Sequence, residues 1–321
     1  MLRRMSTASL ALDPRVFSPD SIDPKTRDFN AKLAELLAGV PPVWMNPPSV
    51  TRAAREAGRG PFGPIVLSPM ATERTIPGPD GPLKLRIMVP PTVNGVYLHF
   101  HGGGWTLGAA HHNDVVLEEL ARTVGLAIIS VDYRLAPEYP YPAGPDDCEA
   151  AALWLVEHAQ SEFGSTRLLI GGESAGAHLS AVTLIRLRDK HHLQPFSRAN
   201  LVFGAYDLVG TPSVQLSTDT LVLTRESIGW FTEQFVPDAD TRRDPDVSPL
   251  WADLRNLPPA LFSVGTLDPL VDDSLFMHAR WVAAGNSSEL AIYPGGVHGF
   301  TSNDFGLARV ARARAAAFLA A

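Results

Sequence analysis

Short apolar runs alternate with longer amphipathic segments along most of this chain, as strands and helices do in a mostly parallel sheet. The turn at 78–82 is short and glycine-containing, so it predicts an antiparallel hairpin of the first two strands at a sheet edge. The pattern predicts an α/β protein whose central eight-stranded, mostly parallel sheet is flanked by helices. Strands are expected at 66–76, 83–89, 95–100, 126–132, 167–171, 199–205, 260–266 and 289–293, and helices at 113–124, 146–160, 175–188, 271–284 and 304–320.

Two regions do not follow this alternation. Residues 1–55 precede the sheet, and residues 208–247 interrupt it between two strands. Within the second region Ile228, Phe231 and Phe235 fall at helical spacing and form an amphipathic stripe. This stripe either seals the segment onto the core or lets Trp230, Phe231 or Phe235 line an apolar substrate pocket.

Composition narrows the classes of function. The net charge of −7 is spread over the chain without a basic block, which argues against a nucleic-acid partner. Cys148 is the only cysteine, so an intramolecular disulfide and a thiolate metal cluster are excluded. The basic start of the chain is not followed by a long apolar run, so we expect a cytoplasmic protein without stable membrane insertion.

The strongest chemical signal is the sequence Gly-Glu-Ser-Ala-Gly at 172–176, between an apolar run and a helix-like segment. A serine flanked by glycines at a strand-to-helix turn is typical of a nucleophile elbow, which presents the hydroxyl of Ser174 clear of the backbone. Glycines at 172 and 176 remove side chains that would clash where the turn is tight. Ser174 is therefore the predicted nucleophile.

A second glycine-rich segment, His-Gly-Gly-Gly-Trp at 101–105, follows the strand predicted at 95–100. Acyl transfer places negative charge on the substrate's carbonyl oxygen, which needs hydrogen-bond donors aimed at it in advance. Glycines allow backbone N–H groups to come close, so Gly102 and Gly103 are candidate donors, together with the N–H of Ala175. Trp105, directly after the glycines, is a further candidate for the substrate pocket.

A base and its orienting acid are expected later in the chain, each just past a strand end. His298 follows the last predicted strand and would take the proton of Ser174, while Asp268 follows the strand at 260–266 and would orient the imidazole. Asp272 and Asp273 compete with Asp268 for this role. They fall in the first turn of the next predicted helix, where acids commonly stabilise the helix dipole, so Asp268 is preferred.

These motifs, in this order, resemble the hormone-sensitive-lipase-like branch of the α/β-hydrolases, the microbial carboxylesterases with an HGGG loop. The resemblance covers about residues 60–321 and includes the segments at 132–138 and 141–143. It implies the α/β-hydrolase fold, with a helical cap formed by 1–55 and 208–247 and a catalytic domain formed by 56–207 and 248–321. It also implies that His101 braces the oxyanion loop. Glu173 and His178 depart from the family's usual residues at those positions.

The sequence therefore predicts a serine carboxylesterase for short- to medium-chain acyl esters, with a small-molecule ester as substrate. An amidase or acyltransferase with the same triad is one alternative, and a receptor that reuses the fold is another. No cofactor and no metal are expected, since the pairs at 111–112 and 191–192 lack a carboxylate at metal-site spacing and look like surface loop histidines. The exposed last strand at 289–293 makes an edge-paired homodimer possible.

Overall fold

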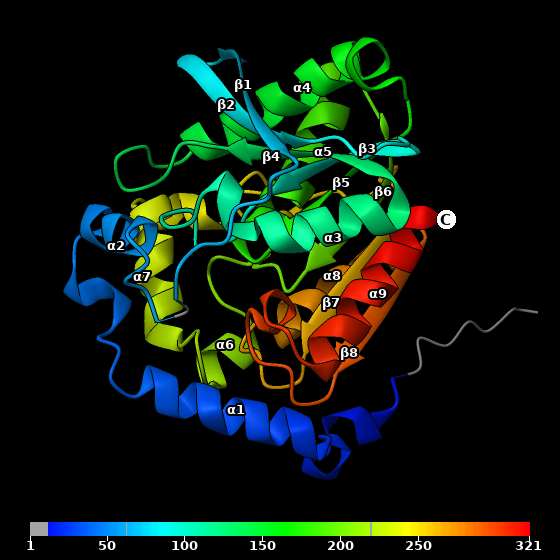
Figure 1. The fold of residues 1–321 in the computed structure, drawn as a ribbon. Coiled ribbons are helices and arrows are strands. Elements are labelled where there is room, and N and C mark those ends of the chain that lie inside the picture. The colour runs from blue at the N-terminus through cyan, green and yellow to red at the C-terminus, as the bar shows by residue number, and fades with distance from the viewer. Residues whose placement is uncertain (1–11, 62, 219) are drawn as a thin grey trace, which may run out of the picture.

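A twisted sheet with helices on both faces forms the body of the protein in this computed structural model, which describes residues 12–61, 63–218 and 220–321 (Figure 1). The strand order is β1-β2-β4-β3-β5-β6-β7-β8. The strands are β1 Ala71–Gly78, β2 Gly81–Met88, β3 Gly95–Phe100, β4 Leu126–Asp132, β5 Leu168–Glu173, β6 Phe196–Val202, β7 Ala260–Gly265 and β8 Ser288–Tyr293.

The sheet is antiparallel at one edge only. Strand β1 pairs with β2, and β2 with β4, in antiparallel register, whereas the remaining neighbours are parallel. The predicted eight-stranded, mostly parallel sheet and its edge hairpin are therefore confirmed. The outer edge of β8 pairs with no further strand of the described residues, and the edge-paired dimer stays a prediction.

Helices cover the sheet in two layers, each with its own apolar core. Helices α4, α5 and α8 contribute to the core on one face, and α3 and α9, with α1 beside them, to the core on the other. The helices are α1 Pro24–Leu37, α2 Pro48–Glu56, α3 Asp114–Val124, α4 Ala143–Phe163, α5 Ala175–His191, α6 Pro212–Leu216, α7 Arg225–Phe235, α8 Val271–Ala283 and α9 Gly306–Ala320. Short 3-10 helices are η1 Pro14–Phe17, η2 Pro19–Ser21, η3 Val43–Met45, η4 Ala110–Asn113, η5 Ala239–Arg243, η6 Pro249–Trp251 and η7 Phe300–Ser302.

Helices α1, α2, α6 and α7 occupy the two regions that did not follow the strand–helix alternation, and they contribute no strand. Helix α7 of the second region contacts η3 of the N-terminal region. Asn30 of α1 donates a hydrogen bond of 2.8 Å to the carbonyl of Gly295. The cap and catalytic-domain boundaries given above stay predictions.

Several predicted boundaries are wrong. Strand β1 begins at Ala71 and not at residue 66, because Val66 and Leu67 are exposed and pair with no strand. Strand β6 lies three residues earlier than predicted, at Phe196–Val202. Helix α4 begins at Ala143, since Pro145 in its first turn lacks only an N–H that needs no partner there. Among the described residues, no helix is both long enough and apolar enough to cross a membrane.

Candidate active site

The serine at the turn between β5 and α5 has a backbone conformation that is rare for a residue with a side chain. Ser174 has φ 57° and ψ −120°, a region that costs a residue with a Cβ on the order of 1–3 kcal/mol. The two glycines of the motif allow the elbow to pack closely against the end of β3. A Cβ on Gly172 would lie 2.2 Å from the carbonyl oxygen of Phe100, and one on Gly176 would lie 1.8 Å from the same oxygen. The elbow therefore fits against the end of β3 only with glycine at both positions.

The three predicted triad residues lie together. The Oγ of Ser174 lies 2.9 Å from Nε2 of His298, and Oδ2 of Asp268 lies 2.9 Å from Nδ1 of the same ring. A carboxylate can only accept, so Nδ1 carries the proton and the Nε2 lone pair faces the serine hydroxyl. The second oxygen of Asp268 accepts the N–H of Leu270 at 2.9 Å. The arrangement is that of a nucleophile, a general base and an acid that orients the base.

The competing acids are held elsewhere. Asp272 accepts the N–H of Ser213 at 2.8 Å. Asp273 is buried and accepts hydrogen bonds from the backbone of Tyr206 and Asp207 and from the hydroxyl of Thr211. Both acids therefore help to attach the segment after β6 to the start of α8, and the structure records no bond from either to His298.

The glycines after β3 border the elbow. A Cβ on Gly102 would lie 3.5 Å from the Cβ of Ser174, and Gly103 and Gly104 have φ of +118° and +58°. No backbone carbonyl of the described residues accepts a hydrogen bond from the N–H of Gly102 or Gly103. Ala175 is the first residue of α5, where N–H groups lack partners within the helix. The three predicted oxyanion donors thus come from adjoining segments around Ser174.

His101 is buried beneath this loop. Its Nδ1 donates to the carbonyl of Gly102 at 2.8 Å, and its ring stacks on Tyr133 with centroids 4.2 Å apart. The hydroxyl of Tyr133 donates to the carbonyl of His101 at 2.7 Å. Burial lowers the pKa of His101 to about 4, so the ring is neutral at neutral pH. These contacts are those of a brace for the glycine loop.

The four predicted pocket aromatics divide into two pairs. Trp105 and Phe235 are 5% and 1% exposed and stack on each other with centroids 4.7 Å apart, so little of either ring is left to contact a substrate. Phe231 instead lies over the glycine loop, since a Cβ on Gly104 would fall 2.4 Å from its ring. Trp230 packs against Phe231 at 5.1 Å and is half-buried.

The structure also gives positions to the two residues that depart from the family pattern. Glu173 accepts hydrogen bonds from Nε2 of His99 at 3.0 Å and from Nδ2 of Asn113 at 3.1 Å. His178 accepts the indole N–H of Trp105 at 3.0 Å and donates from Nε2 to the carbonyl of Val247 at 2.8 Å. Both residues join the elbow to neighbouring segments, and nothing in the sequence pattern identifies their partners.

One neighbour of the triad was missed by sequence reasoning. The ring of Phe203 lies 4.9 Å from the ring of His298, and Phe203 has φ 37° just after β6. A phenylalanine at a strand end has no signature that separates it from a core residue, so only the fold could reveal this contact.

The sequence model of the α/β-hydrolase fold family matches residues 97–302. The chain belongs to the α/β-hydrolases, in the hormone-sensitive-lipase-like branch of carboxylesterases.

Two relatives from Mycobacterium tuberculosis illustrate this family. The carboxylic ester hydrolase LipN is 37% identical over 71% of this chain and 64% of its own length, so a third of LipN has no counterpart in the alignment. The carboxylesterase NlhH is 35% identical over 90% of this chain and 92% of its own. Among solved structures, the hyperthermophilic esterase of Pyrobaculum calidifontis superposes with a TM-score of 0.83 at 29% identity, covering 93% of this chain and 98% of that one.

Proposed function

We propose that this protein is a serine carboxylesterase that hydrolyses short- to medium-chain acyl esters through an acyl-enzyme. The observation that carries the proposal is the continuous contact from Ser174 through His298 to Asp268, with 2.9 Å at both steps. Membership of the carboxylesterase branch supports ester substrates.

In the first half-reaction the Oγ of Ser174 attacks the ester carbonyl carbon while Nε2 of His298 takes the hydroxyl proton. The N–H groups of Gly102, Gly103 and Ala175 would stabilise the negative charge on the carbonyl oxygen, and each such donor is worth about 2.7–4 kcal/mol. The bond to the alcohol then breaks, and the alcohol leaves with the proton from His298.

In the second half-reaction water takes the place of the serine hydroxyl. His298 removes a proton from the water, whose oxygen attacks the acyl carbon, and the proton returns to Ser174 as the acid is released. The buried carboxylate of Asp268 stabilises the imidazolium in both halves. Every proton transfer in the cycle is therefore between Nε2 of His298 and an oxygen atom of the serine, the alcohol or the water.

Aromatic side chains beside the glycine loop support a preference for short to medium chains. Phe231 and Trp230 would line the acyl or alcohol side of the site, whereas Trp105 and Phe235 are buried against each other. A bulky ring lying directly over Gly104 leaves little depth for a long chain at that side of the loop. The amidase and acyltransferase alternatives use the same triad and differ only in the nucleophile or the leaving group.

The test is hydrolysis of p-nitrophenyl esters from acetate to palmitate, with Ser174→Ala as the matched inactive variant. We expect a maximum at short chains and a loss of kcat on the order of 10⁶-fold in the variant. Serine-dependent turnover on no chain length would contradict the proposal. Amine and alcohol acceptors added to the assay would reveal an acyltransferase by a new ester or amide product.

A further inference from the structure

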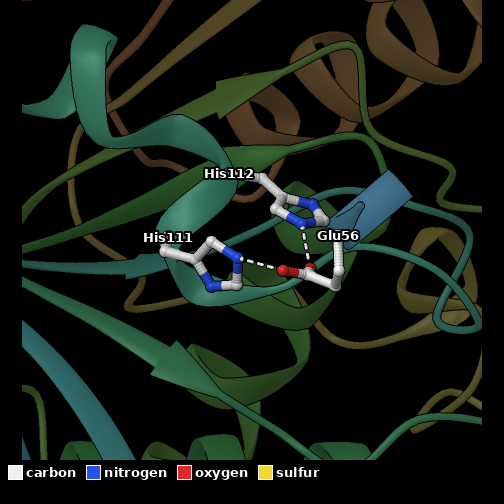
Figure 2. Close-up of side chains that lie close together, drawn as sticks. All are labelled: Glu56, His111 and His112. Carbon is white, nitrogen blue, oxygen red and sulfur yellow. Dashed lines mark hydrogen bonds and ion pairs between the residues drawn. The ribbon is translucent and has the colours of Figure 1, made fainter. Parts of the chain in front are cut away.

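Two neighbouring histidines converge on one carboxylate where α2 meets the segment after the glycine loop. The Nε2 of His111 lies 3.0 Å from Oε2 of Glu56, and the Nε2 of His112 lies 2.7 Å from Oε1 of the same group. Figure 2 shows both rings directed at the two carboxylate oxygens from the 3-10 helix η4. The cluster therefore joins residues that lie 55 and 56 positions apart in the chain.

This convergence is not a consequence of helix geometry. Neighbouring side chains on a 3-10 helix point about 120° apart, because the helix has about three residues per turn. The rings of His111 and His112 nevertheless lie edge to face with centroids 4.6 Å apart. One ligand atom from each of the three residues falls within 4.8 Å of the other two.

We propose that Glu56, His111 and His112 form a binding site for one divalent transition-metal ion, with Zn²⁺ as the best match. Imidazole nitrogen and carboxylate oxygen are both Zn²⁺ ligands, and three protein ligands leave a fourth position for water. To bind an ion, each imidazole would present the lone pair of Nε2 and carry its proton on Nδ1. The sequence did not predict this site, because no carboxylate lies at metal-site spacing from the histidine pair along the chain.

The distances from each imidazole to the carboxylate are close to those between ligands of one ion. Bonds of about 2.0–2.2 Å in a tetrahedral site place ligand atoms about 3.4 Å apart, so each nitrogen must move roughly half an ångström from the carboxylate. The Glu56 side chain is 48% exposed, which leaves a route for the ion and its water, whereas the His112 side chain is only 6% exposed. His112 is thus neither a surface nor a loop residue, contrary to the sequence prediction.

One nearby charge opposes the ion. Arg55, a half-buried residue next to Glu56, carries a positive charge that also acts on His112, and its Nε has no partner among the described residues. Glu56 supplies the compensating negative charge within the cluster. We therefore expect weaker binding than at a four-ligand structural zinc site.

Occupation of the site would fasten α2 to the segment that follows the glycine loop. One turn earlier in α2, Arg52 already donates to the carbonyl of Thr106 at 2.8 Å. A metal ion at Glu56 would add a second link between the same two segments. Its effect would be on the stability and local opening of α2, separate from the proposed ester chemistry.

The experiment is a titration of the full-length protein, free of any histidine tag and stripped with a chelator, with Co²⁺ followed by visible absorption. We expect one equivalent to bind with bands of a low-symmetry four-coordinate ion, and Zn²⁺ to displace it. In Glu56→Gln and His111→Ala the affinity should fall by at least about tenfold, because each removes a direct ligand. Circular dichroism would verify that both variants are folded.

The matched control is His191→Ala, since His191 also contacts a glutamate, Glu149, at 2.6 Å but without a second imidazole. This variant should bind Co²⁺ as the parent does. Hydrogen exchange in α2 should slow on addition of Zn²⁺ to the parent and not to Glu56→Gln. Absence of saturable binding, or equal binding by the parent and Glu56→Gln, would overturn the proposal.

Discussion

The indole N–H of Trp105 donates to Nδ1 of His178 at 3.0 Å, which links the glycine loop to the helix that follows the nucleophile. Because indole only donates, Nδ1 must be unprotonated, and Nε2 then carries the proton given to Val247. Both ring nitrogens are satisfied only in the neutral form. Burial lowers the pKa of His178 to about 4 in agreement with this arrangement.

The first prediction concerns acid stability. An unfolded histidine binds a proton near pH 6.5, whereas folded His178 does so only near pH 4, so the free energy of unfolding falls as pH decreases between these values. The full contribution is about 3 kcal/mol. In His178→Asn the loss of stability between pH 7 and pH 4.5 should be smaller, as measured by urea unfolding. The same pH dependence of stability in His178→Asn and in the parent would contradict this account. The control is His191→Asn, which replaces a half-buried histidine.

The second prediction separates the acids at the start of α8. Asp268→Asn should lower kcat on the order of 10⁴-fold, because an amide no longer holds His298 in the productive tautomer. Asp272→Asn should leave kcat within a few fold, since Asp272 bonds Ser213 and not the imidazole. Steady-state kinetics on one p-nitrophenyl ester compare the two. A larger loss in Asp272→Asn would reverse the assignment.

The third prediction tests the glycine loop. A Cβ at Gly103 would lie 2.2 Å from the carbonyl oxygen of Leu107 at φ +118°, so Gly103→Ala must displace the predicted donors. We expect kcat to fall about 10²–10³-fold. Gly164→Ala, at φ +70° with nothing within 4 Å of the new Cβ, is the control for backbone strain alone. Equal activity losses in both variants would argue against a role of Gly103 in the oxyanion hole.

The fourth prediction distinguishes aromatic residues that stabilise the fold from those that line the substrate pocket. Phe235→Ala removes a ring that is 1% exposed and stacked on Trp105, and should cost about 3–5 kcal/mol of stability. Phe231→Ala should cost less stability and shift the preferred acyl chain to greater length, because it uncovers Gly104. Thermal unfolding and the ester panel measure these effects. An unchanged chain-length profile in Phe231→Ala would remove Phe231 from the pocket.

Much of the fold could be predicted from local patterns. The inner strands β3, β4, β5 and β7 are buried almost throughout, so most of them read as apolar runs, and the glycines at 172 and 176 report a close approach that no side chain allows. The grouping of Ser174, Asp268 and His298 could be predicted because each lies within a few residues of the carboxyl end of a strand, and those ends lie at the same side of the sheet.

Contacts between distant segments could not be predicted in this way. The Trp105–Phe235 stack and the convergence of Glu56 on His111 depend on how helices outside the sheet pack, and that packing has no periodic signature. The predicted start of β1 is too early because the apolar run there includes Val66, which favours strands, although neither Val66 nor Leu67 finds a partner. Propensity describes a residue's preference, whereas pairing depends on the rest of the fold.

The backbone of Ser174 also determines which inactive variant gives a clean comparison. Alanine keeps the Cβ and therefore keeps the unfavourable conformation at φ 57°, so Ser174→Ala removes the hydroxyl alone. Glycine would relax the turn, and its own greater unfolded-state entropy, about 0.5–1 kcal/mol, would offset only part of that gain. The backbone conformation that presents the nucleophile therefore lowers the stability of the fold. A substitution that relaxes it would stabilise the chain and remove the reactive hydroxyl, so selection for stability alone would favour loss of Ser174.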